Sequence, residues 1–256
     1  MHSPLPAPFR TTPIAHRGYH NRAAGRPENS RAAVQAAVAA GYAIEIDLQL
    51  SSDGQAMVFH DYDLNRLTDA TGPLATRSAA ALAGIPLKNG SDGIPTLPEI
   101  LHLISGRVPL LIEIKDQDGA MGPDTGALEA ATARALEGYP GPVAVMSFNP
   151  HSMAEMARLA PHIPRGITTS AYDPADWSPL PARVCDHLRA IPDYGRVGAS
   201  FISHEWQDLL RPRVAALKAE GAVILCWTIR APEAESTARH SADNITFENY
   251  PAPLPA

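Results

Sequence analysis

The sequence contains little cysteine and few aromatic residues, and it lacks a long hydrophobic run. Two of its 256 residues are cysteines, and 6% are aromatic. Cys185 and Cys226 do not form a CxxC pair and stand in mixed or apolar surroundings, so we expect two buried free thiols, with one disulfide as the alternative. No stretch approaches the length of a membrane span, and the proline-containing start lacks the apolar region of a signal peptide. These absences predict a cytoplasmic soluble protein without stable membrane insertion.

Dense clusters of lysine and arginine are also missing. The chain has 21 Lys and Arg against 27 Asp and Glu, which gives a net charge of −6 and a pI near 5.9. This charge balance argues against a nucleic-acid partner. The sequence contains neither a GxGxxG motif nor a P-loop, so the usual marks of a nucleotide-binding sheet are absent as well.

Apolar strand segments alternate with helical segments along most of the chain. The main strands are expected at residues 13–17, 42–50, 109–115, 142–148, 164–170, 199–203, 222–229 and 244–248. Helices are expected at residues 30–40, 97–105, 150–159, 180–190, 208–220 and 232–240. This alternation predicts one α/β domain over residues 1–256 that folds as a TIM (β/α)8 barrel, with an open doubly wound sheet as the alternative. Outside the pattern, residues 1–11 are expected to form a loose N-terminal arm, and residues 62–95 an irregular excursion.

Polar side chains gather where the first three main strands end. His16 and Arg17 follow the first strand, and His60 follows a short strand at residues 56–59. The strict alternation of segment 42–50 places its polar residues, Glu45, Asp47 and Gln49, on one face. Glu113 and Lys115 occupy alternate positions at the end of the third main strand. Because TIM-barrel active sites lie at the carboxyl ends of the strands, we expect these side chains to converge.

Three carboxylates at one barrel mouth require a compensating charge. Glu45, Asp47 and Glu113 would repel one another and raise their own pKa values. A hard divalent cation removes that conflict, and oxygen ligands suit Mg²⁺ or Ca²⁺. The alternative is that Glu45 and Asp47 are solvated residues on an edge strand.

The histidines and cations around these acids suit phosphate chemistry. His16 and His60 could act as general base and general acid, although a single histidine after a strand is commonly structural. Arg17 and Lys115 could offset the negative charge of a phosphate, or could simply pair with carboxylates.

In this order, the residues resemble the glycerophosphodiester phosphodiesterase family, which belongs to the wider phosphatidylinositol-phospholipase-C-like TIM barrels. The resemblance extends over nearly the whole chain. It is carried by His16-Arg17-Gly18, Pro27-Glu28-Asn29, Glu45-Ile46-Asp47, Asp53-Gly54, His60-Asp61, Ile94-Pro95-Thr96-Leu97, Glu113-Ile114-Lys115 and Trp227-Thr228.

The resemblance implies a role for each matching position. It implies that Glu45, Asp47 and Glu113 bind the metal and that His16 and His60 are the acid/base pair. It also implies that Arg17 and Lys115 hold the phosphate, with Asn29 nearby as an amide donor. Residues 61–97 correspond to a small insertion between strands two and three that helps to cover the site and contributes to substrate choice. Trp227 matches a family aromatic that either lines the pocket or packs in the barrel.

The last strand departs from the family pattern. The family often ends in Ile-x-Thr-Asp-x-Pro, whereas this chain reads Ile-Thr-Phe-Glu-Asn-Tyr-Pro from Ile245 to Pro251. Glu248 is the candidate for the acidic role, but its spacing differs. This departure affects the expected choice of alcohol and leaves the expected phosphodiester chemistry in place.

The function implied by the resemblance is metal-dependent hydrolysis of a glycerophosphodiester to glycerol phosphate and an alcohol. Lysophospholipids or sugar phosphodiesters are alternative substrates of the same chemistry. A glycosidase that uses Glu45 and Glu113 is a more distant alternative, and so is a phosphate-binding barrel without catalysis. The sequence leaves open which alcohol is released and whether the metal is Mg²⁺ or Ca²⁺. It also leaves open which histidine is the base and what the oligomeric state is.

Overall fold

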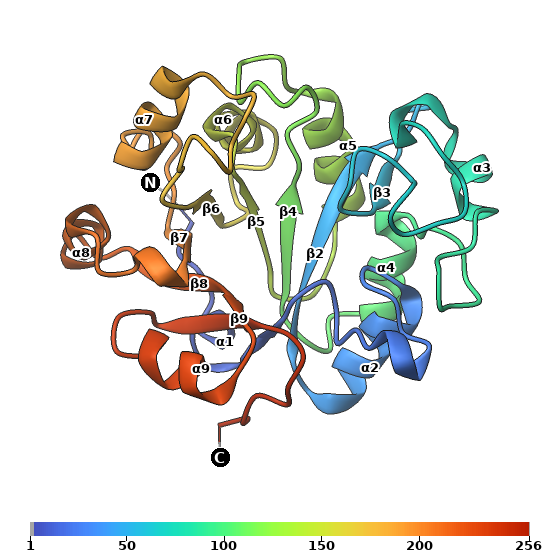
Figure 1. The fold of residues 1–256 in the computed structure, drawn as a ribbon, viewed down its shortest axis with the longest axis horizontal. Coiled ribbons are helices and arrows are strands. Elements are labelled where there is room, and N and C mark those ends of the chain that lie inside the picture. Colours follow the sequence, from blue (N-terminus) through green and yellow to red (C-terminus); the bar gives the residue numbers. More distant parts are fainter. Residues whose placement is uncertain (1–2, 256) are drawn as a thin grey trace.

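Eight parallel strands form a closed barrel in a computed structural model that describes residues 3–255 (Figure 1). The first strand, β1, pairs with both β2 and β9, which closes the barrel. The TIM-barrel prediction is therefore confirmed. The barrel strands are β1 (Ile14–Ala15), β2 (Ala43–Leu50), β4 (Leu110–Ile114), β5 (Val143–Ser147), β6 (Arg165–Thr169), β7 (Phe201–Glu205), β8 (Val223–Ile229) and β9 (Asn244–Phe247).

Helices surround the barrel on the outside. They are α2 (Arg31–Ala40), α4 (Leu97–Ile104), α5 (Ala127–Leu136), α6 (Pro150–Leu159), α7 (Ala182–Ala190), α8 (Pro212–Ala219) and α9 (Pro232–Ala238). Local sequence explains their starts: the Ser30 side chain caps α2, and Thr96 and Glu99 form a capping box at α4. The sequence did not predict α5, whose alanine-rich segment gives a weak contrast between its apolar and polar faces.

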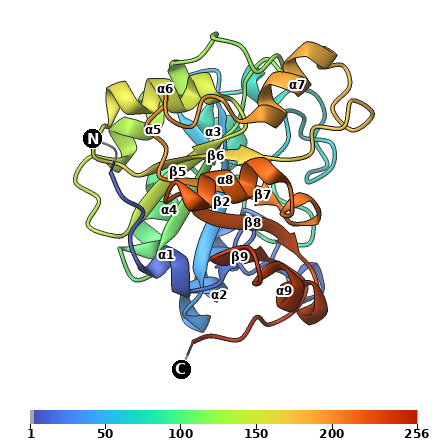
Figure 2. The ribbon, with the colours of Figure 1, turned by 90° about the vertical axis from the view of Figure 1, so that its left-hand side faces the viewer.

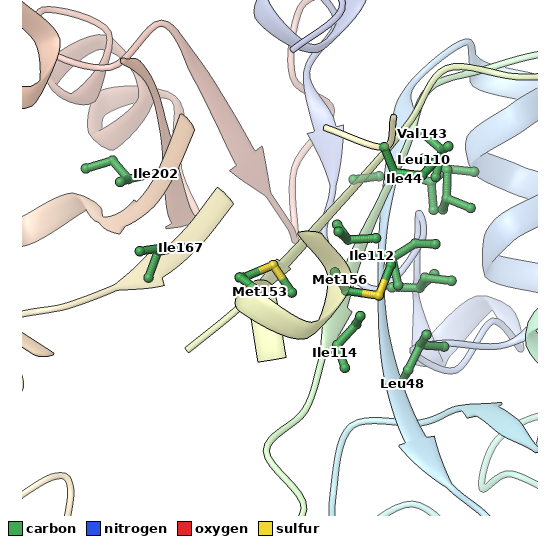
Figure 3. Close-up of a cluster of buried hydrophobic side chains, with 14 of the residues drawn as sticks. Ile44, Leu48, Leu110, Ile112, Ile114, Val143, Met153, Met156, Ile167 and Ile202 are labelled. Atoms are coloured by element: carbon green, nitrogen blue, oxygen red, sulfur yellow. The ribbon is translucent and has the colours of Figure 1, made fainter. Parts of the chain in front are cut away.

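The main hydrophobic core lies between the barrel and its helices. Ile44, Ile46 and Leu48 of β2 point into this layer, as the alternation predicted. Figure 3 shows Met156 of α6 beside Ile112 of β4 in the same layer. The other face of β2, which carries the acidic residues, therefore points into the barrel.

A second apolar cluster closes the end of the barrel opposite to the site, and the N-terminal arm belongs to it. Leu5 and Phe9 pack there with Ile14 and Phe201, and Phe9 is fully buried. Figure 2 shows the short helix α1 (Pro8–Thr11) near β9, and the Asn244 side chain donates hydrogen bonds to two carbonyls of this segment. The expectation of a loose arm at residues 1–11 is therefore wrong for residues 3–11, because Phe9 fills the barrel end. Residues 1 and 2 lie outside the described residues.

One glycine makes room for this packing. A Cβ atom on Gly166 of β6 would lie 2.4 Å from the ring of Phe201. Any side chain at this position would overlap the ring, so the glycine lets a large aromatic side chain fill the barrel interior.

The segment that departs from the strand–helix pattern forms a small apolar cluster of its own. It begins with β3 (Ala56–Val58), which pairs antiparallel with β2, and it includes α3 (Ala79–Ala83). Its buried residues are Met57, Phe59, Leu64, Leu67, Leu74, Leu82, Leu87 and Ile94. The segment lies beside β2 at the edge of the barrel (Figure 1). That the chain forms one domain with an insertion at 61–97 stays a prediction.

Cys185 and Cys226 are both buried free thiols, as predicted. Within residues 3–255, no helix combines the length and the apolar character needed to cross a membrane.

Candidate active site

The first strand ends in a tight turn that anchors it to the second strand. Arg17 and Gly18 both adopt left-handed backbone conformations, with φ of 54° and 76°. The Arg17 amide donates a hydrogen bond to the Glu45 carboxylate at 2.9 Å, and the Gly18 amide donates to the Glu45 carbonyl at 3.0 Å. A Cβ on Gly18 would lie 3.0 Å from Ala33 of α2, so this position requires glycine.

Three carboxylates meet inside the barrel mouth. One oxygen each of Glu45, Asp47 and Glu113 lies within 4.8 Å of the others, and all three side chains are buried. The register of the sheet explains this, because Asp47 of β2 pairs directly with Glu113 of β4. Burial and the neighbouring carboxylates raise the pKa of Glu45 well above its usual value. Such a set of buried oxygen donors fits a hard divalent cation.

Lys115 lies among these acids and partly neutralises them. Its Nζ is 2.8 Å from the Asp47 carboxylate and 2.5 Å from that of Glu113. Burial alone would raise the pKa of Asp47, but Lys115, His60 and Arg17 outweigh it and hold that pKa well below the usual range. The predicted residues thus lie together as an ion-paired cluster.

Asn29 makes a contact that the sequence did not suggest. Its amide nitrogen donates to Asp47 Oδ2 at 2.9 Å, and its amide oxygen accepts from the Asp47 backbone N–H at 3.2 Å. The side chain is fully buried. In the described structure Asn29 therefore orients a carboxylate of the acidic cluster, whereas the sequence suggested a phosphate contact.

His16 is held between two carboxylates. Its Nδ1 lies 2.6 Å from Glu248, and its Nε2 lies 4.0 Å from Glu45. An ionised carboxylate can only accept a hydrogen bond. Nδ1 of His16 therefore carries a proton and donates a hydrogen bond to Glu248. Burial lowers the pKa of His16 to about 4. Arg230 and His20 also contact Glu248, at 2.7 and 3.4 Å, and fix its position.

His60 and Arg17 are connected by a chain of ion pairs. His60 Nδ1 lies 2.7 Å from Asp61, and Arg66 binds both oxygens of Asp61 at 2.7 and 2.8 Å. Arg66 also binds both oxygens of Glu28 at 2.8 Å, and Glu28 accepts a hydrogen bond from Arg17 at 2.6 Å. Burial opposes ionisation of Glu28, but these arginines lower its pKa to about 2. Sequence reasoning assigned no role to Glu28, Asp61 or Arg66, although Asp61 directly follows His60.

Comparisons with known proteins agree with this geometry. The model of the glycerophosphoryl diester phosphodiesterase family matches residues 16–246. The chain belongs to this family. A glycerophosphodiester phosphodiesterase of Caldanaerobacter subterraneus is 32% identical over 252 residues, which cover 94% of this chain and 95% of the relative. One from Bacillus subtilis is 27% identical over 266 residues, which cover 96% and 86% of the two chains.

A solved structure with the same fold holds a reaction product. The Oleispira antarctica phosphodiesterase in complex with the product sn-glycerol-3-phosphate matches with a TM-score of 0.74 and 26% identity, over 93% of this chain and 92% of that one. The resemblance seen in the sequence is thereby confirmed, and this chain is a phosphoric diester hydrolase of the glycerophosphodiester phosphodiesterase type. The comparisons lend no support to a glycosidase or to a barrel without catalysis.

Two cavities border the site of this phosphodiesterase, one beside each histidine. The first, of about 690 Å³, is polar, and its lining includes His16, Arg22, Arg26 and Glu248. The second, of about 530 Å³, is more apolar. It is lined by Gln49, His60, Asp61, Tyr62, Asp63, Asn65, Arg66, Glu113, Lys115, Asp116, Met121, Phe148 and Trp177.

Trp227 lies at the inner wall of the barrel beside the second cavity. Its indole N–H donates to the Ser203 carbonyl at 2.9 Å, and its ring is 5.6 Å from that of Phe148, centroid to centroid. Its contacts in the described structure are thus with the barrel and with one lining aromatic. A direct contact with substrate stays a prediction.

Proposed function

We propose that the chain hydrolyses glycerophosphodiesters in a metal-dependent reaction in which His16 and His60 transfer the protons. One observation carries this proposal: each histidine contacts a carboxylate through Nδ1, and each borders a different cavity beside the same acidic cluster. Each Nε2 is therefore the nitrogen available for proton transfer.

Glu45, Asp47 and Glu113 would hold the divalent cation, and Arg17 and Lys115 would contact the phosphate. A bound Mg²⁺ or Ca²⁺ would supply positive charge near the phosphoryl oxygens. Lys115 helps to keep Asp47 ionised, and the hydrogen bond from Asn29 orients its carboxylate for that role. Arg17 is itself held in place by a hydrogen bond to Glu28, so its positive charge is preorganised for the phosphate.

The proton transfers follow from the hydrogen bonds of the two histidines. Because Glu248 accepts the Nδ1 proton of His16, the lone pair on Nε2 is free to act as a base. His16 takes the proton of the substrate's glycerol hydroxyl, whose oxygen then forms a bond to phosphorus. The bond from phosphorus to the alcohol breaks, and His60 gives its proton to the leaving oxygen. Water then opens the cyclic phosphate with the two roles reversed.

The second cavity is the proposed place for the alcohol, since it lies beside the histidine that protonates it. Its aromatic side chains, including Tyr62, Phe148 and Trp177, accept an organic group of moderate size. Lysophospholipids and sugar phosphodiesters remain alternative substrates of the same reaction. Comparison of kcat/KM over glycerophosphocholine, a lysophospholipid and a sugar phosphodiester distinguishes them.

The central test combines two substitutions with metal removal. His16→Ala and His60→Ala should each lower kcat/KM for glycerophosphocholine by about 10²–10⁴-fold, because each removes a proton-transfer group. EDTA should abolish turnover, and Mg²⁺ or Ca²⁺ should restore it. His102→Ala, an exposed histidine on α4, is the matched control and should retain full activity. If hydrolysis survives all three treatments, the proposed site is wrong.

The cyclic intermediate has its own test. In a single turnover in H₂¹⁸O, the label should enter glycerol phosphate only after a cyclic phosphate has formed. Labelled product that appears at the earliest times, with no cyclic species trapped, would contradict the intramolecular route.

A further inference from the structure

A second group of potential metal ligands lies next to the acidic cluster. One ligand atom each of His16, His20 and Glu248 lies within 4.8 Å of the others, and Glu248 Oε2 faces His16 Nδ1 at 2.6 Å and His20 Nε2 at 3.4 Å. They come from the turn after β1 and from the end of β9. The set offers two imidazole nitrogens and one carboxylate oxygen, whereas Glu45, Asp47 and Glu113 offer oxygen alone. Imidazole nitrogen favours zinc over magnesium and calcium.

The distances suit a tetrahedral ion with small adjustments. Zinc lies about 2.0–2.2 Å from nitrogen and oxygen ligands, so ligand atoms around it are about 3.4 Å apart. His20 and Glu248 are already 3.4 Å apart, and the separation of His16 and Glu248 would widen from 2.6 Å by less than about 1 Å. The polar cavity borders all three residues, so an ion can enter and can keep a water as its fourth ligand.

The arginine that holds Glu248 contacts only one of its two carboxylate oxygens, and the other oxygen faces the two histidines. Arg230 donates to Oε1 at 2.7 Å, while both histidines face Oε2. A ligating carboxylate is typically oriented by such a hydrogen bond. The nearby arginines repel a dication, so the affinity should be lower than that of a closed structural zinc site.

We propose that His16, His20 and Glu248 form a zinc site, and that zinc bound there inhibits the enzyme. Binding forms bonds from zinc to His16 Nδ1, His20 Nε2 and Glu248 Oε2, and it releases the Nδ1 proton of His16 to solvent. The neutral ring must then carry its proton on Nε2, where it can no longer accept one from the substrate. Zinc binding needs no assumption about the reaction, whereas the inhibitory effect rests on the proposed function of His16.

The test measures zinc binding and inhibition separately, in saturating Mg²⁺. Co²⁺ serves as a spectroscopic probe, because its visible absorption is much stronger in a four-coordinate site than among six oxygen ligands, and Zn²⁺ is titrated against a chelating dye. The wild-type chain should bind one Zn²⁺ and lose activity in parallel. His20→Gln should weaken both zinc binding and inhibition by about tenfold or more, with inhibition measured relative to the variant's own activity without zinc. His102→Gln, an exposed histidine on α4, should behave like the wild type.

Glu248→Gln provides a second, independent measurement of binding alone. It should also weaken Zn²⁺ binding by about tenfold or more, whatever its activity. The proposal is overturned if His20→Gln and Glu248→Gln both bind zinc like the wild type. It is also overturned if excess Mg²⁺ displaces the zinc, because the ion would then occupy the acidic cluster. A chain that binds zinc through these residues but does not hydrolyse glycerophosphodiesters would contradict the proposed function alone.

Discussion

Glu248 controls which nitrogen of His16 carries a proton. The carboxylate lies 2.6 Å from Nδ1 and is itself held by Arg230. Burial opposes the negative charge on Glu248, but the hydrogen bonds from His16 and His20 hold its pKa far below the usual value. An ionised partner thus fixes one tautomer of the imidazole and directs Nε2 toward the acidic cluster.

Glu248→Gln should therefore damage catalysis more than folding. The amide keeps the size of the side chain but can donate to Nδ1, which favours the wrong tautomer, so kcat should fall by about 10²-fold while KM changes little. Steady-state kinetics with glycerophosphocholine and a thermal unfolding curve measure the two effects. Glu233→Gln, an exposed acid on α9, is the control. A kcat within twofold of the wild type would show that Glu248 does not position the base.

The N-terminal arm is the element that seals the barrel. α1 places Phe9 at the closed end of the barrel, in the apolar cluster that also contains Ile14, Leu111 and Phe201. Two hydrogen bonds from Asn244 hold its backbone to the last strand. This element therefore contributes buried apolar area, although it supplies no residue to the acidic cluster.

Phe9→Ala should lower the free energy of unfolding by roughly 3 kcal/mol, because the deletion leaves a cavity that the rigid strands cannot fill. Chemical denaturation followed by circular dichroism measures the loss. Leu210→Ala, at a side chain that is 89% exposed, should change stability by less than about 0.5 kcal/mol. Equal stability of the two variants would mean that the arm packs only loosely.

The segment between β3 and α4 supplies His60 and Asp61 to the site, and Arg66 of the same segment ties them to its other side. Arg66 binds Asp61 beside His60 and Glu28 beside Arg17. The small apolar cluster of this segment, with Leu64 and Leu67 on either side of the arginine, fixes where its backbone lies. The element thus links one catalytic candidate to the phosphate-binding candidate across the mouth of the barrel.

On the scale of the whole molecule, stability should depend on pH through a buried histidine outside the site. His204 of β7 is fully buried and contacts the Thr169 hydroxyl at 2.7 Å and Asp208 at 3.2 Å. Burial lowers its pKa below the usual 6.5, despite the opposing effect of Asp208. The folded chain therefore keeps the ring neutral at a pH where the unfolded chain binds a proton.

This difference has no effect well above pH 6.5, and it lowers the stability of the fold as the pH falls below that value, because the unfolded chain then takes up a proton that the folded chain does not. The free energy of unfolding should drop between pH 8 and about pH 5.5 in the wild type. In His204→Gln the drop should be smaller, since glutamine does not titrate. Urea unfolding at pH 8 and at about pH 5.5 measures the change in the free energy of unfolding for each of the two proteins. Equal changes in the wild type and in His204→Gln would show that His204 does not cause the pH dependence.

Much of the barrel and its acidic cluster could be predicted, because both follow from local periodicity. Strand period two places Glu45 and Asp47 on one face, and parallel pairing brings Glu113 beside them. The partner of Asn29 could not be predicted, since its contact with Asp47 depends on a left-handed backbone and on tertiary packing. The packing of Phe9 escaped prediction for a similar reason: one aromatic residue among prolines shows no periodicity.

The closure of the barrel by β1 and β9 has a consequence for synthesis on the ribosome. Only two residues, Ile14 and Ala15, form β1, and they need partners from both ends of the chain. His16 and Glu248, which meet at that seam, are 232 positions apart. A nascent chain can therefore carry all three acids and both histidines long before the carboxylate that orients one of them has been translated. Catalytic competence should arise late, together with the final step of folding.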